Sequence, residues 1–431
     1  MITARAWSGR RYAVLGLARS GAATVEALLA SGAEVLAWDE RAEARASFQG
    51  RVTLSDPLES DLTGYTGVVV SPGVPLNTHP IKPHADRFGV PVIGDVELFA
   101  QARSELPPHK VVGITGTNGK STTTALVHHI IKTEGVLTTM GGNIGLPILE
   151  QDPLPEGGVY VLELSSYQID LTYSLDCDVA VLLNVTPDHL DRYENFEAYR
   201  ASKLRLFEMQ SNKSVSVFHF DTDGYGDVIS QSRPSDSWCW FSNDDLGLPE
   251  SQSNWPSLQG SHNRQNVLAA INVAACLDID EETIIQALRA FPGLPHRMER
   301  VAEISGIAYI NDSKGTNTAA SAPALAAFDD IHWIVGGLAK EPGLGECEAE
   351  LSRVKAAYTI GDSGPAFAEL LETRVPVTQS HTLDRAVRDA SAKAREGDTV
   401  LLSPACASFD QFRDFEARGD AFKALVKELA A

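Results

Sequence analysis

Apolar positions in this chain gather into short runs rich in valine, isoleucine and leucine, and stretches with helical spacing follow most of them. A run of four to eight such residues is typical of a strand buried on both faces. In the first part of the chain, strands are expected at residues 12–16, 34–38 and 68–70, with a helix near 20–31. Strands that alternate with helices predict an α/β fold whose sheet is mostly parallel.

The same alternation returns twice further along the chain. In the middle part, the expected elements are strands at 111–115, 159–164 and 179–184 and helices at 120–133 and 196–207. In the last part, strands are expected near 307–311, 331–335, 357–360 and 399–402, again with helical stretches between them. Each part therefore predicts an open α/β sheet of its own.

Two stretches that each contain two prolines, 102–109 and 291–295, divide these parts. A chain of 431 residues also exceeds the size of a single core. We expect three domains: a Rossmann-like N-terminal domain at 1–98, a central P-loop ATPase-like domain at 99–294, and a C-terminal Rossmann-like open sheet at 295–431. Residues 211–260 are rich in Ser, Asp, Asn and Trp and predict a less regular region, to which no role is assigned.

Composition narrows the possible partners. The net charge of -21 argues against general binding to nucleic acid or to an anionic membrane, which needs basic surfaces. No apolar run approaches the ~18 residues needed to cross a bilayer. The five cysteines are scattered without C-x-x-C spacing, so neither disulfides nor a zinc site is expected. A cytoplasmic protein without membrane insertion is therefore predicted.

The stretch that carries most chemistry is the turn between the expected strand 111–115 and the expected helix 120–133. It reads Gly116-Thr117-Asn118-Gly119-Lys120-Ser121-Thr122. Backbone N–H groups in such a turn can cradle phosphates, the lysine can reach the outer phosphates, and the serine can bind Mg²⁺. Ile114 stands where the common P-loop pattern has its first glycine. An ordinary strand–helix turn is the alternative, but Lys-Ser directly after the last glycine favours a nucleoside triphosphate site.

A second glycine-containing turn, Gly16-Leu17-Ala18-Arg19-Ser20-Gly21, follows the first expected strand. Asp39 stands about 20 residues later, as in dinucleotide-binding sites. However, Ala18 replaces the middle glycine that lets a pyrophosphate approach the backbone, which weakens an NAD interpretation. Nucleotide binding and a purely structural domain both remain open for this part. Ser71-Pro72-Gly73 forms a further loop after a strand of the same expected sheet.

Three further residues of the middle part are considered as possible metal-binding or phosphate-binding residues. Glu163 follows a buried strand, where it could hold Mg²⁺ or cap the next helix. His189 lies in the polar cluster 184–192 and could bind a metal or phosphate, although a histidine beside a turn is more often structural. Lys203 lies in the expected helix 196–207, and the residues alone give no reason to single it out.

Taken together, these motifs resemble those of the Mur ligases, the ATP-dependent amino-acid ligases of peptidoglycan synthesis. The resemblance covers essentially the whole chain, through the segments 116–122, 163–168, 184–191, 260–266, 294–299 and 311–314. Within the family, residues 403–412 resemble most closely the members that add D-glutamate. The resemblance implies ligation of D-glutamate to UDP-N-acetylmuramoyl-L-alanine, driven by ATP through an acyl phosphate, and a monomeric enzyme is expected.

The resemblance also gives roles to individual positions. It implies a catalytic set of Lys120, Glu163, His189 and Lys203. Two Mg²⁺ ions are implied on Ser121, Glu163, His189 and Lys203, with Lys203 carbamylated so that it presents a carboxylate-like group. ATP would contact the turn residues Gly116, Thr117, Asn118, Gly119, Lys120, Ser121 and Thr122, and also Asn263, Asn266, Arg297 and Asp312.

The two other substrates receive their own residues in the same way. The UDP-linked substrate would contact Ala18, Arg19, Asp39, Ser71, Gly73, Asn143 and His189. D-glutamate would be held by Thr316, Lys340, Ser408 and Phe415. The loop around Lys340 resembles the family's glycine–lysine loop but departs from it at Glu341-Pro342, so the resemblance supports the role of Lys340 less strongly than that of Lys120.

Three other classes of function compete with this interpretation. A ligase for another amino acid, or one that adds glutamate to folate, would share the ATP site, and residues 403–412 argue against both. An NAD oxidoreductase would leave Lys120, Glu163 and Lys203 unexplained. A nucleotide switch or a binding module would hydrolyse ATP without an amino-acid acceptor.

Overall fold

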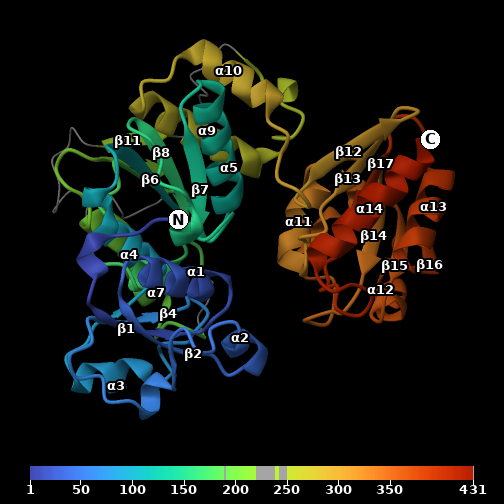
Figure 1. Cartoon of the computed structure of the whole chain (residues 1–431). Helices are drawn as coiled ribbons and strands as arrows, with labels where there is room; N and C mark the ends of the chain where they lie inside the picture. The colour runs from blue at the N-terminus through green and yellow to red at the C-terminus, as the bar shows by residue number, and fades with distance from the viewer. Residues whose placement is uncertain (189–190, 220–237, 242–249, 431) are drawn as a thin grey trace. The chain divides into compact units, whose positions relative to one another are not determined.

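The computed structural model describes residues 1–188, 191–219, 238–241 and 250–430, and these residues form three α/β sheets (Figure 1). The chain divides into two compact units. The first unit comprises Met1–Leu248 and Gln265–Ala287 and holds two of the sheets. The second unit comprises Pro249–Arg264 and Leu288–Ala431 and holds the third. The expected α/β class with three open sheets is confirmed.

The first sheet has five parallel strands in the order β3-β2-β1-β4-β5. Its strands are β1 (Arg11–Leu15), β2 (Glu34–Trp38), β3 (Thr53–Leu54), β4 (Gly67–Val70) and β5 (Val92–Ile93). Its helices are α1 (Arg19–Ala30), α2 (Ala42–Ala46), α3 (Ile81–Arg87) and α4 (Asp95–Ala102). The predicted strands and helix of this part are confirmed to within a residue or two, because β1 and β4 are almost wholly buried and therefore apolar.

The central sheet has six parallel strands in the order β11-β10-β9-β6-β8-β7. Its strands are β6 (His109–Thr115), β7 (Thr138–Gly142), β8 (Gly158–Glu163), β9 (Val179–Leu182), β10 (Val215–His219) and β11 (Trp238–Phe241). Its helices are α5 (Lys120–Thr133), α6 (Ser166–Asp170), α7 (Phe196–Glu208), α9 (Ser261–Cys276) and α10 (Glu281–Ala290). The predicted helix at 120–133 coincides with α5.

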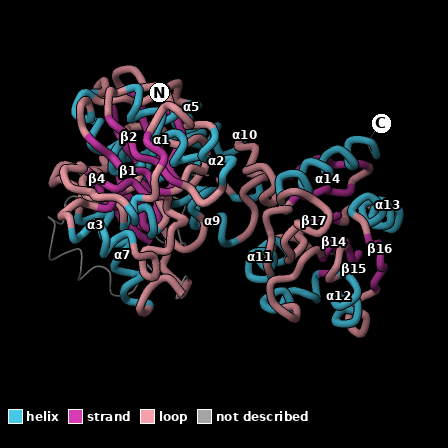
Figure 2. Tube along the Cα trace, turned by 60° about the horizontal axis from the view of Figure 1, so that its bottom comes forward, coloured by secondary structure: helices cyan, strands magenta, loops and turns pink. Residues whose placement is uncertain are grey.

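The third sheet has six strands in the order β12-β13-β17-β14-β15-β16, and only the pair β12–β13 is antiparallel among the described strands. Its strands are β12 (Glu299–Ile304), β13 (Ile307–Asn311), β14 (Ile331–Gly336), β15 (Val354–Ile360), β16 (Val377–His381) and β17 (Thr399–Leu402). Its helices are α11 (Thr318–Ala326), α12 (Gly364–Leu371), α13 (Leu383–Lys393) and α14 (Phe415–Leu429), and Figure 2 shows them around the strands.

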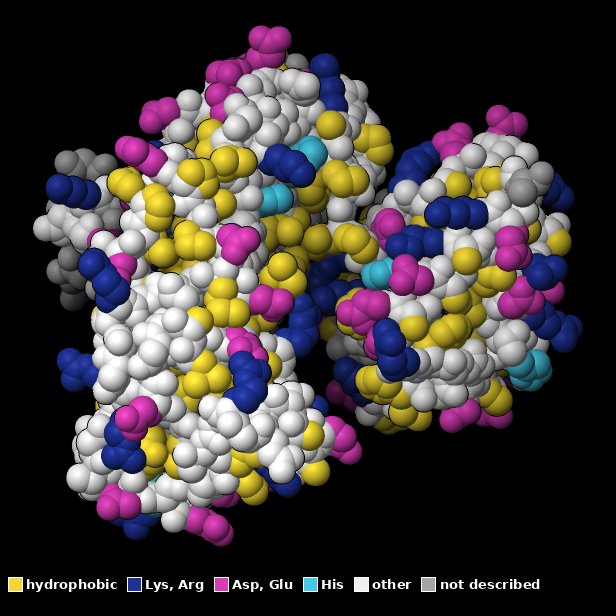
Figure 3. Space-filling view, in the orientation of Figure 1, with side chains coloured by type: hydrophobic (Ala, Val, Ile, Leu, Met, Phe, Trp, Pro, Cys, Tyr) yellow, Lys and Arg dark blue, Asp and Glu magenta, His cyan; other side chains and the backbone are white. Residues whose placement is uncertain are grey.

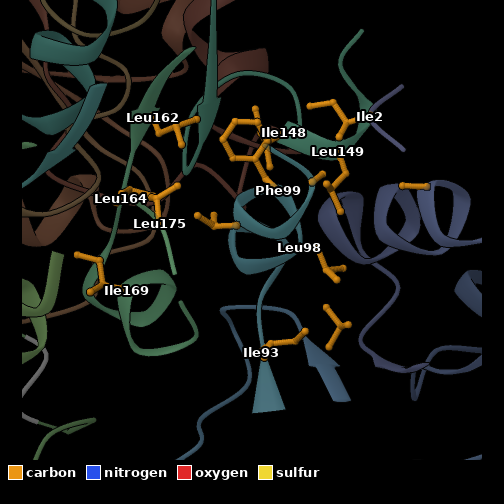
Figure 4. Packing of buried hydrophobic residues seen from close by; sticks show 14 of the residues in the cluster. Ile2, Ile93, Leu98, Phe99, Ile148, Leu149, Leu162, Leu164, Ile169 and Leu175 are labelled. Carbon is orange, nitrogen blue, oxygen red and sulfur yellow. The ribbon is translucent and has the colours of Figure 1, made fainter. Parts of the chain in front are cut away.

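One hydrophobic core runs through both sheets of the first unit. It includes Trp7 and Val14 of the N-terminal part and Tyr160 and Leu182 of the central sheet. Figure 4 shows how Leu98 and Phe99 of α4 lie in this cluster with Ile148, Leu149, Leu162 and Leu164. The buried carboxylate of Glu97 adds polar contacts, since it accepts hydrogen bonds from the backbone N–H groups of Tyr173 (2.7 Å) and Ser174 (3.0 Å). Apolar packing and a buried carboxylate thus hold the first two sheets together.

The surface is strongly charged. On the face shown in Figure 3, acidic and basic side chains are interspersed over both units. Among the described residues, no helix has the length and apolar character of a membrane span.

Candidate active site

The glycine-rich turn joins the buried strand β6 to helix α5 and depends on two glycines. Gly116 has φ +157° and Gly119 has φ +84°, a region that L-residues rarely adopt. A Cβ atom on Gly119 would lie 2.2 Å from Oδ1 of Asn266 in α9, so a side chain has no room there. The backbone of the turn thus packs directly against the Asn266 side chain of α9, which is possible only because residue 119 has no Cβ atom.

The end of the neighbouring strand β9 holds the turn in place. The N–H of Thr117 donates to the carbonyl of Asn184 (2.9 Å), and the N–H of Asn118 donates to the Asn184 side chain (2.8 Å). The hydroxyl of Thr117 accepts from the N–H of Thr186 (3.0 Å). These contacts order the segment between the two glycines before any ligand binds, which lowers the entropic cost of binding phosphate there.

Two lysines meet at this turn. The Nζ atom of Lys120, at the start of α5, donates to the carbonyls of Gly116 (2.8 Å) and Thr117 (2.7 Å). The Nζ atom of Lys203, in α7, donates to the same Gly116 carbonyl (2.9 Å). Lys203 is 1% exposed and lies over the ring of Tyr199, with 4.5 Å between Nζ and the ring centroid. Burial, with the nearby charge of Lys120, lowers the pKa of Lys203 to about 7.

A buried carboxylate stands at the end of β8. Glu163 is 2% exposed, and its Oε1 accepts a hydrogen bond from the Asn143 side chain (2.9 Å). Its Oε2 is buried and has no hydrogen-bond partner. A buried acceptor without a partner is costly unless a cation or donor reaches it. Glu163 thus has one oxygen available for a metal ion, as predicted for Mg²⁺.

Of the other expected metal ligands, the structure describes Ser121 but not His189. Ser121 is the second residue of α5 and is half-buried. His189 lies outside the described residues. Within the parts of the chain that the structure describes, no group of three or more His, Cys, Asp and Glu side chains could hold a metal. The described acidic, histidine and cysteine side chains therefore do not by themselves show a magnesium site here.

At the carboxyl edge of the first sheet, the turn after β1 lies against a loop of the central part. Ala18 precedes α1, and Arg19 donates from Nη2 to the carbonyl of Gly145 (3.0 Å), in the loop that also carries Asn143. The Ser71 hydroxyl donates to the carbonyl of Gly16 (3.3 Å). The structure thus brings together several residues predicted to bind the UDP-linked substrate.

The carboxylate of Asp39 already has several hydrogen-bond partners within the protein. Its carboxylate accepts from the N–H of Leu17 (2.7 Å) and from the N–H and Nε of Arg41 (both 3.0 Å). The hydrogen bond from the Arg41 side chain holds the pKa of Asp39 well below its usual range. Asp39 therefore fixes the glycine-containing turn, and a sugar hydroxyl would have to share an oxygen that is already bonded.

In the second unit, the expected D-glutamate residues lie on loops after three parallel strands. Thr316 follows β13, Lys340 follows β14, and Ser408 follows β17, while Phe415 is the first residue of α14. An isolated bridge between Leu338 and Ala407 sets the second and third of these loops side by side. Parallel strands present such loops at one edge of a sheet, so these four residues gather at the carboxyl edge.

Arg418 is a residue of this edge that the sequence did not reveal. It is 1% exposed and donates to the Ser313 carbonyl (2.8 Å) and hydroxyl (3.0 Å) and to the Cys406 carbonyl (3.0 Å). Burial lowers its pKa to about 10. Arg418 thereby joins the loops after β13 and β17. The only signal in the sequence is an arginine in an otherwise amphipathic helix, which normally indicates an exposed side chain.

Four of the expected ATP-binding residues lie outside the glycine-rich turn, and two of these four are in α9. Asp312 directly follows β13, is buried, and accepts from the Ser403 hydroxyl (2.7 Å) and the N–H of Met298 (3.2 Å). Burial raises its pKa to about 7. Arg297 lies nearby and its charge opposes that rise. Asn263 and Asn266 lie in α9, where Asn266 accepts from the Thr123 hydroxyl (3.2 Å).

Known proteins are similar to this chain in sequence and in fold. A model of the Mur ligase middle domain matches residues 114–244, and a model of the Mur ligase glutamate ligase domain matches residues 296–406. A UDP-N-acetylmuramoylalanine--D-glutamate ligase of Novosphingobium aromaticivorans is 59% identical over 429 residues, covering 100% of this chain and 97% of the relative. One of the same name from Zymomonas mobilis is 53% identical over 445 residues and covers 100% of both chains.

Solved structures show the same fold at low sequence identity. The MurF ligase of Thermotoga maritima in complex with ADP has a TM-score of 0.61 at 17% identity, covering 98% of this chain and 99% of that one. The UDP-N-acetylmuramate-alanine ligase MurC of the same organism has a TM-score of 0.58 at 17% identity, covering 97% and 99%.

Proposed function

The chain belongs to the Mur ligase family, and from this membership we propose that it joins D-glutamate to UDP-N-acetylmuramoyl-L-alanine, with ATP as the energy source, in peptidoglycan precursor synthesis. Relatives of that name match the chain over its full length at 53–59% identity. The structural observation that carries the proposal is the meeting of Lys120 and Lys203 on the Gly116 carbonyl at the glycine-rich turn. The expected cytoplasmic location, monomeric state and domain boundaries remain part of the proposal.

The glycine-rich turn supports the binding of ATP. Its N–H groups and the start of α5 suit phosphate oxygens, and Lys120 supplies a positive charge that can move from the backbone carbonyls to a β- or γ-phosphate. Asn266 supports the turn from α9. The other proposed contacts with ATP are Thr117, Asn118, Ser121, Thr122, Asn263, Arg297 and Asp312.

Magnesium fits the residues that surround the turn. Glu163 offers a buried oxygen without a partner, and Ser121 offers a hydroxyl at the start of α5. With a pKa near 7, Lys203 is largely neutral slightly above neutral pH, and a neutral amine can react with CO₂ to give a carbamate. That modification would turn a buried ammonium into a second oxygen ligand. We propose two Mg²⁺ ions held by Ser121, Glu163, His189 and carbamylated Lys203. When bound, Mg²⁺ would neutralise charge on the transferring phosphoryl group.

The reaction then has two steps. An oxygen of the alanyl carboxylate attacks the γ-phosphorus of ATP, the bond to the bridging oxygen of ADP breaks, and an acyl phosphate forms. The amine of D-glutamate next attacks the acyl carbon, phosphate leaves, and the amine loses a proton as the amide forms. Lys120 stabilises the charge that moves onto the phosphate oxygens. His189 is proposed to orient the acyl phosphate.

The two other substrates are assigned to the carboxyl edges of the first and third sheets. Arg19 and Asn143 lie beside the loop at Gly145, which supports a site for the diphosphate and sugar of the UDP-linked substrate. Ala18, Asp39, Ser71 and Gly73 complete that proposed set. For D-glutamate, the cation of Lys340 suits a dicarboxylate, and Thr316, Ser408 and Phe415 lie on the neighbouring loops.

The decisive experiment measures ATP-dependent phosphate release with UDP-N-acetylmuramoyl-L-alanine and a panel of amino acids. The panel contains D-glutamate, L-glutamate, L-alanine, L-lysine and no amino acid. Release that requires both the nucleotide substrate and D-glutamate is the expected result. Release with another amino acid keeps the ligase class and contradicts the assignment of the last domain. Release without any acceptor would favour a nucleotide switch.

A further inference from the structure

Two of the five cysteines lie side by side at the edge of the central sheet. Cys239 is in β11, where it stands opposite Val217 of β10, and Cys276 is the last residue of α9. Their Sγ atoms are 3.9 Å apart, and both side chains are half-buried. A disulfide bond is about 2.05 Å long, so the two sulfurs need to move only roughly 2 Å closer to bond.

The other three cysteines have environments that suppress reaction. Cys177, Cys347 and Cys406 are buried, and burial raises the pKa of each thiol to about 12. Because the thiolate is the reacting form, these three are inert near neutral pH. They also serve as internal controls for any reaction at the pair.

Within the pair, the two thiols are not equivalent. The hydrogen bond between them lowers the pKa of Cys239, while the same hydrogen bond, followed by burial, raises the pKa of Cys276. These opposite shifts favour the thiolate at Cys239 and the protonated thiol at Cys276. A thiol whose pKa lies near the ambient pH is the best attacking group in thiol–disulfide exchange.

We propose that Cys239 and Cys276 form a reversible dithiol–disulfide pair, a modification site that joins β11 to the C-terminal end of α9. The oxidant is a low-molecular-weight disulfide such as glutathione disulfide. The Cys239 thiolate attacks one sulfur of the oxidant, its S–S bond breaks, and one thiolate leaves. Cys276 gives its proton to the released thiolate and then, as a thiolate, attacks the Cys239 sulfur. The bond between Cys239 and the second sulfur of the oxidant breaks, and that sulfur leaves as a thiolate, which takes its proton from water. The pair loses two electrons and the one proton of Cys276, and the oxidant becomes two thiols.

The position of the pair connects it with the glycine-rich turn. Helix α9 carries Asn266, which lies against Gly119 and accepts a hydrogen bond from Thr123. A covalent bond at the end of this helix would tie it to the edge strand of the sheet. The site would thus restrain the helix that supports the turn, in a chain whose described residues contain no disulfide.

The test treats the full-length, reduced protein with glutathione disulfide near pH 7.5 and counts thiols after denaturation. We expect two of the five thiols to disappear, the intact mass to fall by two hydrogens, and one cross-linked peptide pair to contain Cys239 and Cys276. Dithiothreitol should restore all five thiols. Retention of all five, a glutathione adduct that persists on Cys239, or a cross-link to another cysteine would overturn the proposal.

Two variants test the order of the reaction. Cys276→Ser should accumulate one glutathione on Cys239, because the attacking thiol remains and the resolving thiol is gone. Cys239→Ser should react at least tenfold more slowly, roughly the difference between a largely ionised and a largely protonated thiol. Equal rates for the two variants would contradict the assigned roles. These measurements require no ligase activity, so they succeed or fail independently of the proposed function.

Discussion

Lys120 and Lys203 donate to the same acceptor, the carbonyl oxygen of Gly116, at 2.8 Å and 2.9 Å. Two ammonium groups on one carbonyl repel each other, and the charge of Lys120 contributes to the lowered pKa of Lys203. The arrangement therefore favours a neutral Lys203. The charged Lys120 is thereby suited to bind phosphate, and the neutral Lys203 is suited to react with an electrophile such as CO₂.

The first prediction concerns carbamylation of Lys203. With a pKa of about 7, about 90% of the unmodified amine is neutral at pH 8 and about 10% at pH 6. Enzyme prepared in CO₂-free buffer should therefore have low activity and should recover on addition of bicarbonate, roughly tenfold faster at pH 8 than at pH 6 for equal dissolved CO₂. The measurement is the lag in product formation. Full activity in CO₂-free buffer would contradict carbamylation.

Lys203→Arg and Lys203→Ala should both abolish turnover, because neither side chain can form a carbamate. Lys203→Arg keeps the positive charge, so its failure separates the need for a carbamate from the need for a cation. Activity of either variant within a few-fold of the wild type would argue against Lys203 as a metal ligand.

The second prediction concerns Lys120. Lys120→Ala should lower kcat by at least about 10²-fold, since a preorganised charge on a transferring phosphoryl group contributes on this scale. Lys132→Ala is the matched control, because Lys132 is exposed at the other end of the same helix α5. Steady-state phosphate release measures both. Equal effects of the two substitutions would remove Lys120 from the active site.

The local elements at this site could be predicted, whereas their convergence could not. The strand, the glycine-rich turn and helix α5 follow from apolar runs and glycines that are adjacent in sequence. The contact between Lys203 and Gly116 depends on how α7 packs on the sheet, which no local pattern encodes. The resemblance to a known family assigned Lys203 a role, and the residues by themselves indicated only a helical lysine.

Three of the strands that the apolar pattern does not reveal, β7, β12 and β16, share a physical cause. β7 and β16 are edge strands, β12 pairs with its neighbour as a hairpin, and all three are mostly half-exposed. Edge strands need fewer apolar residues, so the runs that reveal buried strands are missing from them. Asp39 is a related case, since its distance from the first glycines is typical of dinucleotide-binding sites, while the hydrogen bonds of its carboxylate to Leu17 and Arg41 could not be read from the sequence.

The third prediction tests the close approach of Gly119 to α9. Gly119→Ala places a Cβ 2.2 Å from Oδ1 of Asn266, at a φ of +84°. Gly135→Ala is a matched control, because Gly135 follows the same helix, has φ +85°, and would meet no atom within 4 Å. Both variants should lose about 1 kcal/mol for the backbone conformation. Only Gly119→Ala should also weaken ATP binding, by at least tenfold in a titration.

The double variant Gly119→Ala/Asn266→Ala refines this test. The added Cβ of Gly119→Ala would also clash with the Asn266 side chain, which would lower stability beyond the cost of the backbone conformation. If so, removing that side chain should restore part of the stability, and the double-mutant cycle should show a coupling free energy of roughly 0.5–3 kcal/mol. Additive effects would mean that Gly119 matters only for its φ. Thermal and denaturant unfolding provide the free energies.

The fourth prediction concerns the unpartnered oxygen of Glu163. Glu163→Gln keeps a group that can accept from Asn143 and removes the negative charge, so the Mg²⁺ concentration for half-maximal rate should rise at least tenfold. Glu97→Gln is the control, since Glu97 is also buried but bonds to Tyr173 and Ser174. It should reduce stability and leave the Mg²⁺ requirement unchanged. An unchanged requirement in Glu163→Gln would exclude Glu163 as a ligand.

The fifth prediction follows from the buried carboxyl of Asp312, whose pKa is raised to about 7, chiefly by burial. Because the folded state holds this proton more tightly than the unfolded chain, the stabilisation is complete below about pH 4 and is lost as the pH rises to 7. Asp312→Asn cannot titrate, so its stability relative to the wild type should increase by up to roughly 4 kcal/mol between pH 4 and pH 8.

Denaturant unfolding of both proteins across that pH range provides the comparison for Asp312. The pKa of Asp95 is also raised, to about 6, so the wild type and the variant share that background and the difference isolates Asp312. Parallel pH profiles would show that Asp312 is ionised in the folded protein throughout. A diverging profile would instead mean that Asp312 is protonated below neutral pH and becomes a carboxylate only once the pH exceeds about 7.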